Sequence, residues 1–288
     1  MADDVAIKEG HIYGGWRRAV NAASAMTDSI HSDAVAQKLG MRGGAVVGIV
    51  HLNLFPPLFI QALHGQRWCE HGSLSIYYTY ALLDGEQVRG VIGVPPEGAE
   101  DAQVEAWAET PEGQTVGKGT ASVGDPQEIS YLRSLEFQNA EQDKLRILAG
   151  LRVGDELPSQ DVTITQETVD KALETITDPL DWYKGDSPWG GAIAPPSVMY
   201  GAMALSPPEP IEAIGFFGGT EIRNVNGPVK VGVPYRASGK LACVGISAKT
   251  EYYWFDSCLE ERDSGLRVAE MRHMHRFMKA SSPLYKED

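Results

Sequence analysis

Cysteine and positive charge are both scarce in this 288-residue sequence, and each scarcity excludes a class of protein. There are only three cysteines, Cys69, Cys243 and Cys258, an odd number at wide spacing. That pattern is typical of free thiols in a reducing compartment rather than of a disulfide framework. Lys and Arg number 25 against 39 Asp and Glu, a formal net charge of −14. Such a surface repels a phosphate backbone, so no nucleic acid partner is expected.

Long apolar runs are missing as well. The longest, residues 49–63, is interrupted by His51, Asn53 and Pro56-Pro57 and falls short of the roughly 20 apolar residues that span a bilayer. No membrane segment is therefore expected. The first residues, MADDVAIKEG, show neither the basic and apolar regions of a secretory signal nor the character of a mitochondrial transit peptide. These observations predict a cytoplasmic protein.

What the sequence does contain is material for a sizeable core and signs of internal duplication. Hydrophobic residues make up 43% and charged residues 22%, and 288 residues suit two domains of ordinary size or one duplicated unit. Residues 12–31 and 164–183 can be laid over one another without a gap. Each has apolar residues at i, i+3, i+4 and i+7, beginning at Trp16 and at Val169, which predicts an amphipathic helix that feeds a polar loop.

The segments that follow the two predicted helices also correspond. A glycine pair opens GGAVVG (43–48) and GGAIAPP (190–196), and each leads into an apolar segment that we expect to be a buried helix. Strand-like runs rich in β-branched and aromatic residues come next, and the last run of each half contains a hairpin turn, at Glu112-Gly113 and at Ser264-Gly265. The order of elements therefore occurs twice.

This pattern predicts an α+β fold of two helix-on-antiparallel-sheet repeats that pack as a pseudo-dimer. Residues 1–126 would form the first half and residues 158–288 the second. Residues 127–157 are charged and are expected to be a partly helical connection between them.

The stretch TDSIHSDAVAQKLGMRGGAVVG (27–48) resembles a known family. Its run DSIHSD (28–33), followed by Gly43-Gly44 and Gly48, is similar to the core motif of the MaoC-like, (R)-specific enoyl-CoA hydratases in their double hot-dog form. That motif reads Asp, any residue, Asn-Pro, an aliphatic residue and His, then Asp two residues on and a glycine-rich turn into the central helix. The resemblance implies a double hot-dog fold, hydration or dehydration of an acyl-CoA thioester, and no required cofactor.

The resemblance also implies roles for residues around the histidine. His31 would be the general acid or base, with Asp28 orienting it, although Asp28 and Ser29 stand where the family usually has Asn and Pro. The family's catalytic Asp, five residues before the His, falls on Met26, whose thioether cannot act as a base. Asp28 or Asp33 would have to turn inward to replace it.

The second half departs from the motif in a different way. Its matching positions are Asp178 and Tyr183, so the acid is present and a phenol replaces the imidazole. The rings of Trp182 and Tyr183 are expected to wall a cleft that the two halves share.

The glycine-rich turn also suggests a site that stabilises negative charge. A helix N-terminus offers unpaired N–H groups to a developing oxyanion, so the amides of Gly48 and Ile49 are candidate donors. In the second half Pro195-Pro196 occupy the equivalent positions and have no N–H to offer. This asymmetry predicts that the first half is active and the second is structural. The alternative is that the glycines only form a tight turn.

Each histidine has a structural alternative as well. His31 could bracket its loop through backbone hydrogen bonds. His51, one helical turn past Gly48, either lines the site or is a satisfied core histidine. His273 and His275 share a strand face but lack a third ligand, so a solvated basic edge is preferred to a chelate and no metal is expected.

The residues thus predict a lyase or isomerase of MaoC-like type, most economically a hydratase or dehydratase of an acyl-CoA thioester or a similar activated carbonyl. Three alternatives stay open. A cyclase or double-bond isomerase could use the same site on a non-CoA metabolite, a hot-dog thioesterase would need a polar group such as Asn53 on the central helix, and a ligand-binding protein would have lost the chemistry. The expected partner is a small-molecule substrate, and a homodimer is left open.

Overall fold

A 12-stranded antiparallel sheet dominates the structure, a computed structural model that describes residues 5–62, 65–175 and 180–285. Its strand order is β1-β2-β5-β6-β7-β4-β9-β12-β11-β10-β8, and β3 pairs with β5 beside it. The strands of the first half are Ala6–Lys8 (β1), His11–Tyr13 (β2), Arg17–Arg18 (β3), Gly72–Tyr78 (β4), Gln87–Gly93 (β5), Ala102–Glu109 (β6) and Thr115–Val123 (β7). Those of the second half are Glu156–Thr163 (β8), Gly215–Asn224 (β9), Pro234–Ile246 (β10), Thr250–Glu261 (β11) and Arg267–Met278 (β12).

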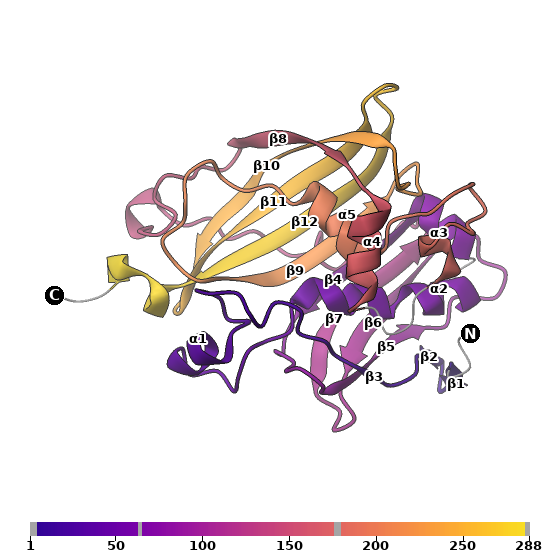
Figure 1. Cartoon of the computed structure of the whole chain (residues 1–288), viewed down its shortest axis with the longest axis horizontal. Helices are drawn as coiled ribbons and strands as arrows, with labels where there is room; N and C mark the ends of the chain where they lie inside the picture. Colours follow the sequence, from indigo (N-terminus) through magenta and orange to yellow (C-terminus); the bar gives the residue numbers. More distant parts are fainter. Residues whose placement is uncertain (1–4, 63–64, 176–179, 286–288) are drawn as a thin grey trace.

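Short helices pack against this sheet, and α2, α4 and α5 gather where the two halves meet (Figure 1). The α-helices are Asp33–Lys38 (α1), Pro56–Ala62 (α2), Gly65–His71 (α3), Gln166–Leu173 (α4) and Pro196–Met203 (α5). The 3-10 helices are Gly48–Leu54 (η1), Gln142–Lys144 (η2), Asp181–Tyr183 (η3), Lys279–Ser281 (η4) and Pro283–Tyr285 (η5). None of the helices in the described residues is long and apolar enough to cross a membrane.

The two halves share one sheet because β4 pairs with β9. Leu74 lies opposite Ile222, and Ile76 lies opposite Thr220. Both predicted hairpin turns are present, between β6 and β7 and between β11 and β12. The predicted arrangement of two helix-on-sheet halves is confirmed, and the structure shows that their sheets are joined edge to edge.

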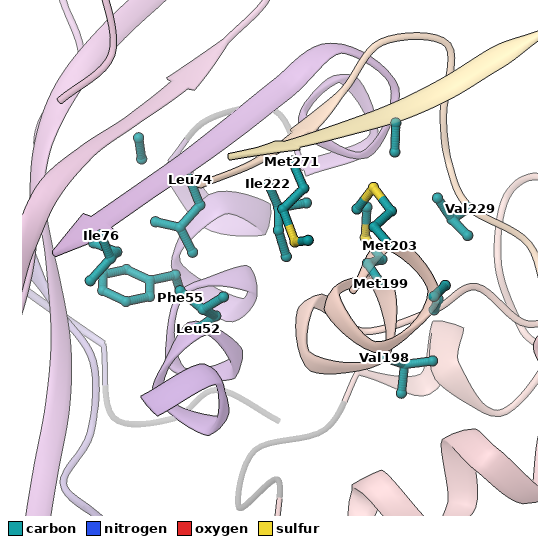
Figure 2. Packing of buried hydrophobic residues seen from close by; sticks show 14 of the residues in the cluster. Leu52, Phe55, Leu74, Ile76, Val198, Met199, Met203, Ile222, Val229 and Met271 are labelled. Carbon is teal, nitrogen blue, oxygen red and sulfur yellow. The ribbon is translucent and has the colours of Figure 1, made fainter. Parts of the chain in front are cut away.

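The central helices of the two halves meet in one apolar core. Leu52 and Phe55 approach from the first half and Met199 and Met203 from α5, beneath the strands that join the halves (Figure 2). Leu52, Phe55 and Met203 are fully buried. Burial of each such side chain stabilises the fold by about 1.5 to 3 kcal/mol. The predicted buried helix of the first half exists, but it is split into η1, α2 and α3, and α2 begins at Pro56.

The helix predicted over residues 12–31 is wrong. This stretch forms β2 and β3, in which Tyr13 pairs with Val91 and Arg17 with Val88 of β5. Gly14 lies against the same strand, since a Cβ at this position would sit 3.3 Å from the Gly90 carbonyl oxygen. Glycine disfavours a helix, and pairing with β5 overrides the apolar periodicity.

The matching helix of the second half is confirmed as α4. Its N-cap, Thr165, accepts a hydrogen bond from the Thr168 N–H at 3.1 Å. Because residues 12–31 form strands, the gapless superposition of the two segments does not reflect a structural repeat.

Most of the segment between β7 and β8 consists of turns, with only the short helix η2. Glu251, fully buried on β11, holds it in place. Its carboxylate accepts the backbone N–H groups of Arg146, Ile147 and Leu148 at 2.9, 3.2 and 2.8 Å, and the Tyr285 hydroxyl at 2.6 Å. A single buried carboxylate thus ties both the connection and the C-terminal turn to the sheet of the second half.

Glu251→Gln should therefore lower the free energy of unfolding by about 2 kcal/mol or more, since hydrogen bonds to charged groups each contribute about 1.5 to 3 kcal/mol. The amide keeps one acceptor oxygen but turns an NH2 group toward N–H donors. Urea unfolding measures the change. Glu209→Gln, at an exposed position, is the matched control, and equal stability of the two variants would contradict the assigned role.

Candidate active site

A cavity of about 220 Å³ opens beside the first turn of η1. Three predicted site residues, His31, Gly48 and His51, line it together. The other lining residues come from the loop before η1, from the end of β4 and from the start of β9 in the second half: Ile30, Met41, Ala45, Val46, Tyr78, Thr79, Tyr80, Ala81, Gly215, Phe216 and Phe217. The cavity therefore lies at the seam between the halves, mostly on the side of the first.

The His31 ring is held by the glycine-rich turn itself. Its Nδ1 lies 2.5 Å from the carbonyl oxygen of Ala45, and the Ala45 N–H donates to the Ile30 carbonyl at 2.9 Å. A carbonyl can only accept, so Nδ1 carries a hydrogen and, in the neutral ring, Nε2 keeps a free lone pair. The loop contact predicted as the structural role of His31 is therefore present, and it leaves Nε2 as the ring nitrogen that does not bind Ala45.

Gly44 is required because two backbone segments touch here. A Cβ at this position would lie 2.3 Å from the carbonyl oxygen of His31. The Gly44 N–H donates to Asp33 Oδ1 at 2.7 Å, and the Asn21 side chain donates to the His31 carbonyl at 2.9 Å. The glycine turn therefore fixes the position of the histidine as well as leading into η1.

The structure does not bring the predicted acids into the cavity. Asp28 is exposed, with a left-handed φ of 56°, and the contact that orients His31 comes from Ala45 instead. Asp33 is exposed and holds Gly44. Met26, at the position of the family's Asp, is 55% exposed. Among the described residues that line the cavity there is no carboxylate.

His51 lines the cavity as a neutral ring. It is 5% exposed, and burial lowers the pKa of its imidazole from 6.5 to about 4. Within the described ranges its ring nitrogens have no protein partner, so one N–H and one lone pair are available to a ligand.

The start of η1 supplies the predicted amides. Gly48 is its first residue and lines the cavity, whereas Ile49 follows it in the helix and does not line it. The first N–H groups of a helix lack an intrahelical acceptor. A Cβ on Gly48 would lie 3.1 to 3.2 Å from three carbons of the Tyr78 ring, so glycine lets this ring lie over the helix start without a shift of the ring.

The equivalent helix start in the second half is closed. Pro195 is the N-cap of α5 and Pro196 its first residue, so neither offers an N–H. The next donor, the Ser197 N–H, is taken by Asn53 Oδ1 at 3.1 Å.

Trp182 and Tyr183 do not line this cavity. Trp182 packs edge-on against Trp189 at 5.4 Å between ring centroids, and Tyr183 is 3% exposed in the core. Asp178 lies outside the described residues.

The predicted solvated basic edge at His273 and His275 is wrong. Their strand, β12, lies inside the sheet between β9 and β11, and His273 is 1% exposed. Burial lowers the pKa of His275 to about 4 and that of His273 well below its ordinary value, so both rings are neutral. In the described part of the chain no three His, Cys, Asp or Glu side chains come together as a metal site.

Tyr78 is a site residue that we did not predict. Alternation along β4 places it on the face of Leu74 and Ile76, the face that packs on the helices. The alternation along this strand can be read from the sequence. The hydrogen-bond partner of Tyr78, Thr220, lies 142 residues away on β9, a strand that we did not predict.

No protein-family model matches the sequence. No curated protein matches it either. Among solved structures, it is similar to one from Chloroflexus aurantiacus that is described as a MaoC domain protein dehydratase, with 10% identity, a TM-score of 0.56, and coverage of 92% of this chain and 93% of that one. A MaoC-like dehydratase is 12% identical, with a TM-score of 0.53 and coverage of 93% and 98%. A conserved hypothetical protein from Mycobacterium tuberculosis, described as having a double hotdog fold, is 11% identical, with a TM-score of 0.57 and coverage of 91% and 94%.

The chain has a double hot-dog fold. The predicted fold class is thereby confirmed, and so is the structural likeness to MaoC-like dehydratases. At identities of 10 to 12% the likeness establishes the fold, and the reaction has to be argued from the cavity.

Gly44→Ala should displace the His31 loop, because the new methyl group would overlap the His31 carbonyl. We expect a loss of about 1 to 3 kcal/mol in the free energy of unfolding, as for overpacked sites. Gly201→Ala is the control: it lies in α5, has nothing within 4 Å of its Cβ position, and should be neutral or stabilising by up to about 1 kcal/mol. Equal effects of the two changes in urea unfolding would argue against the contact.

The buried His51 should make stability depend on pH. Its pKa is about 4 in the folded chain and 6.5 ordinarily, so between these values the unfolded chain binds the extra proton. The free energy of unfolding contributed by this group is complete above pH 6.5 and is lost as the pH falls toward 4. Between pH 7 and pH 5 the wild type should lose up to about 2 kcal/mol more than His51→Leu. The exposed His71→Gln should keep the wild-type difference.

Proposed function

We propose that the chain is a hydro-lyase of MaoC-like type, which adds water to, or removes it from, an α,β-unsaturated thioester or similar activated carbonyl. The observation that carries this proposal is the meeting of His31, Gly48 and His51 in one cavity, with the His31 ring fixed through Nδ1. In this proposal the His31 Nε2 and the N–H at the start of η1 act on the same small volume, which His31 and Gly48 both line. Both are what the reaction needs, a base and an oxyanion donor.

In the hydration direction the His31 Nε2 takes a proton from water while the water oxygen bonds to Cβ of the substrate. The electron pair of the double bond moves toward the carbonyl, and the resulting enolate oxygen is stabilised by the Gly48 N–H. The imidazolium then returns its proton to Cα, so base and acid are the same group. Dehydration follows the same steps in reverse.

A double-bond isomerase or cyclase acting on a non-CoA metabolite is the second candidate. Such a reaction needs only one proton carrier, and the cavity lining contains imidazoles but no carboxylate among the described residues. The described lining also lacks Lys and Arg, and the net charge of −14 does not favour the phosphates of coenzyme A. A thioesterase finds less support, because Asn53 is bonded to Ser197 and does not line the cavity.

The first half is the proposed active half. Its helix start is open at Gly48, whereas that of α5 is closed by two prolines and by Asn53. Homodimer formation and a cytoplasmic location stay predictions.

The test is turnover of crotonyl-CoA and of the N-acetylcysteamine thioester of crotonic acid, followed by loss of the conjugated absorbance. His31→Ala should lower kcat by about 10²- to 10⁴-fold, the range of general acid–base catalysis. The fold should survive, since His31 is only half-buried. His71→Gln, at an exposed position remote from the lining, should keep wild-type rates.

Wild-type rates in His31→Ala would remove His31 from the mechanism. Turnover of the N-acetylcysteamine thioester alone would favour the non-CoA candidate. A wild-type protein that binds either compound without turnover would favour the ligand-binding alternative.

A further inference from the structure

A chain of hydrogen bonds leads from the cavity into the second half. The Tyr78 hydroxyl donates to Thr220 Oγ1 at 3.1 Å, and Thr220 Oγ1 lies 2.9 Å from His273 Nδ1. Thr220 and His273 are 0% and 1% exposed, and the other ring nitrogen of His273, Nε2, is buried without a partner. Neither residue touches the cavity, so Tyr78 is the end of the chain that a ligand meets.

The donor-to-acceptor direction of these hydrogen bonds determines whether the Tyr78 hydroxyl donates or accepts in the cavity. Thr220 has one hydrogen, and because its lone pair accepts from Tyr78, that hydrogen is free for Nδ1 of the neutral His273. The single hydrogen of the Tyr78 hydroxyl is then used inside the protein. Tyr78 lines the cavity, and its oxygen can therefore take part there only as an acceptor.

The position of this oxygen suits the reaction. Tyr78 lies over the helix start, with its Cζ, the carbon that carries the hydroxyl, 3.2 Å from where a Cβ of Gly48 would be. His31 Nε2 is a second acceptor in the same cavity, because Nδ1 holds the hydrogen that is donated to Ala45. A water molecule has two hydrogens and can donate one to each of these groups.

We propose that Tyr78 is a catalytic residue that holds the reacting water together with His31, in place of the carboxylate missing at Met26. Thr220 and His273 are positioning residues of the second half that keep the Tyr78 hydrogen away from the water. This inference rests on the proposed function for the identity of the reaction. In the hydration step the water gives one proton to His31 while its oxygen bonds to Cβ. The other hydrogen stays on that oxygen, hydrogen-bonded to Tyr78 Oη, so Tyr78 itself neither gains nor loses a proton.

The proposed role of His273 accounts for a buried polar ring that destabilises the core. His273 is surrounded by the rings of Tyr200, Phe217 and Phe255, with centroids 5.0, 4.7 and 5.6 Å away. A polar ring with an unpartnered nitrogen is costly in such surroundings, and an apolar side chain would avoid that cost. The bond to Thr220 is what the histidine contributes.

Nitrogen-15 NMR of the histidine side chains tests the direction of the chain without any substrate. His273, assigned by the resonances lost in His273→Gln, should be protonated at Nε2 and unprotonated at Nδ1, whereas His31 should show the opposite pattern. An Nδ1-protonated His273 would donate to Thr220, release the threonine hydrogen toward Tyr78 and overturn the proposal. A crystal structure should also show water between His31 Nε2 and Tyr78 Oη that is absent from Tyr78→Phe.

Kinetics with crotonyl-CoA test the consequence. Tyr78→Phe should lower kcat by about 10²-fold, in the range for loss of one active-site hydrogen bond, with KM little changed. Thr220→Val should lower kcat although Tyr78 is intact, and Thr220→Ser should restore it. Tyr77→Phe is the matched control, because the Tyr77 hydroxyl is bonded to Arg276 and lies outside the lining.

Wild-type kcat in Tyr78→Phe, or in Thr220→Val, would overturn the proposal. If the wild type does not turn over crotonyl-CoA, the proposed function fails on this substrate. The histidine tautomer and the bridging water then still decide whether Tyr78 is an acceptor held by the second half.

Discussion

The pairing of β4 with β9 is the constraint on which the candidate site depends. It sets Ile76 opposite Thr220 and Tyr77 opposite Gly219, so the next residue of β4, Tyr78, ends within reach of the threonine hydroxyl. The same pairing brings the start of β9, including Phe217, into the wall of the cavity. A shift by one residue would move every side chain of β4 to the opposite face. The site is therefore a product of the seam between the halves.

The two halves have complementary rather than equal roles at this seam. η1 and α5 both begin beside it, but only η1 begins with residues that have free amides. The second half uses its own helix start to bind Asn53, which fixes the two central helices relative to each other. The second half thus helps to determine the geometry of the first, whether or not it takes part in any chemistry.

Local features of the site could be predicted from the sequence, and long-range ones could not. His31 and the glycine turn lie within 14 residues of each other, and their contact follows from the run itself. The helix predicted over 12–31 is wrong because the partner of this segment, β5, lies 69 to 80 residues further on, and pairing with that strand outweighs helical periodicity. Strand β9 was not predicted because Gly215, Gly218 and Gly219 lower the β-propensity of its first half. For the same reason, the contact between Thr220 and Tyr78 could not be predicted from the sequence.

Charge sets a limit on the chemistry that this cavity can support. Its described walls present imidazoles, hydroxyls and apolar groups, with no Asp, Glu, Lys or Arg among them. A permanent carboxylate or phosphate placed inside would lose its hydration without gaining a counter-charge, which is costly in a small, poorly hydrated space. Charge that develops only during the proposed reaction is different, because a fixed backbone amide such as that of Gly48, which lines the cavity, would stabilise it without reorganisation. For the proposed reaction, the part of the substrate that reacts is therefore expected to enter uncharged, with any charged group that it carries outside the cavity mouth.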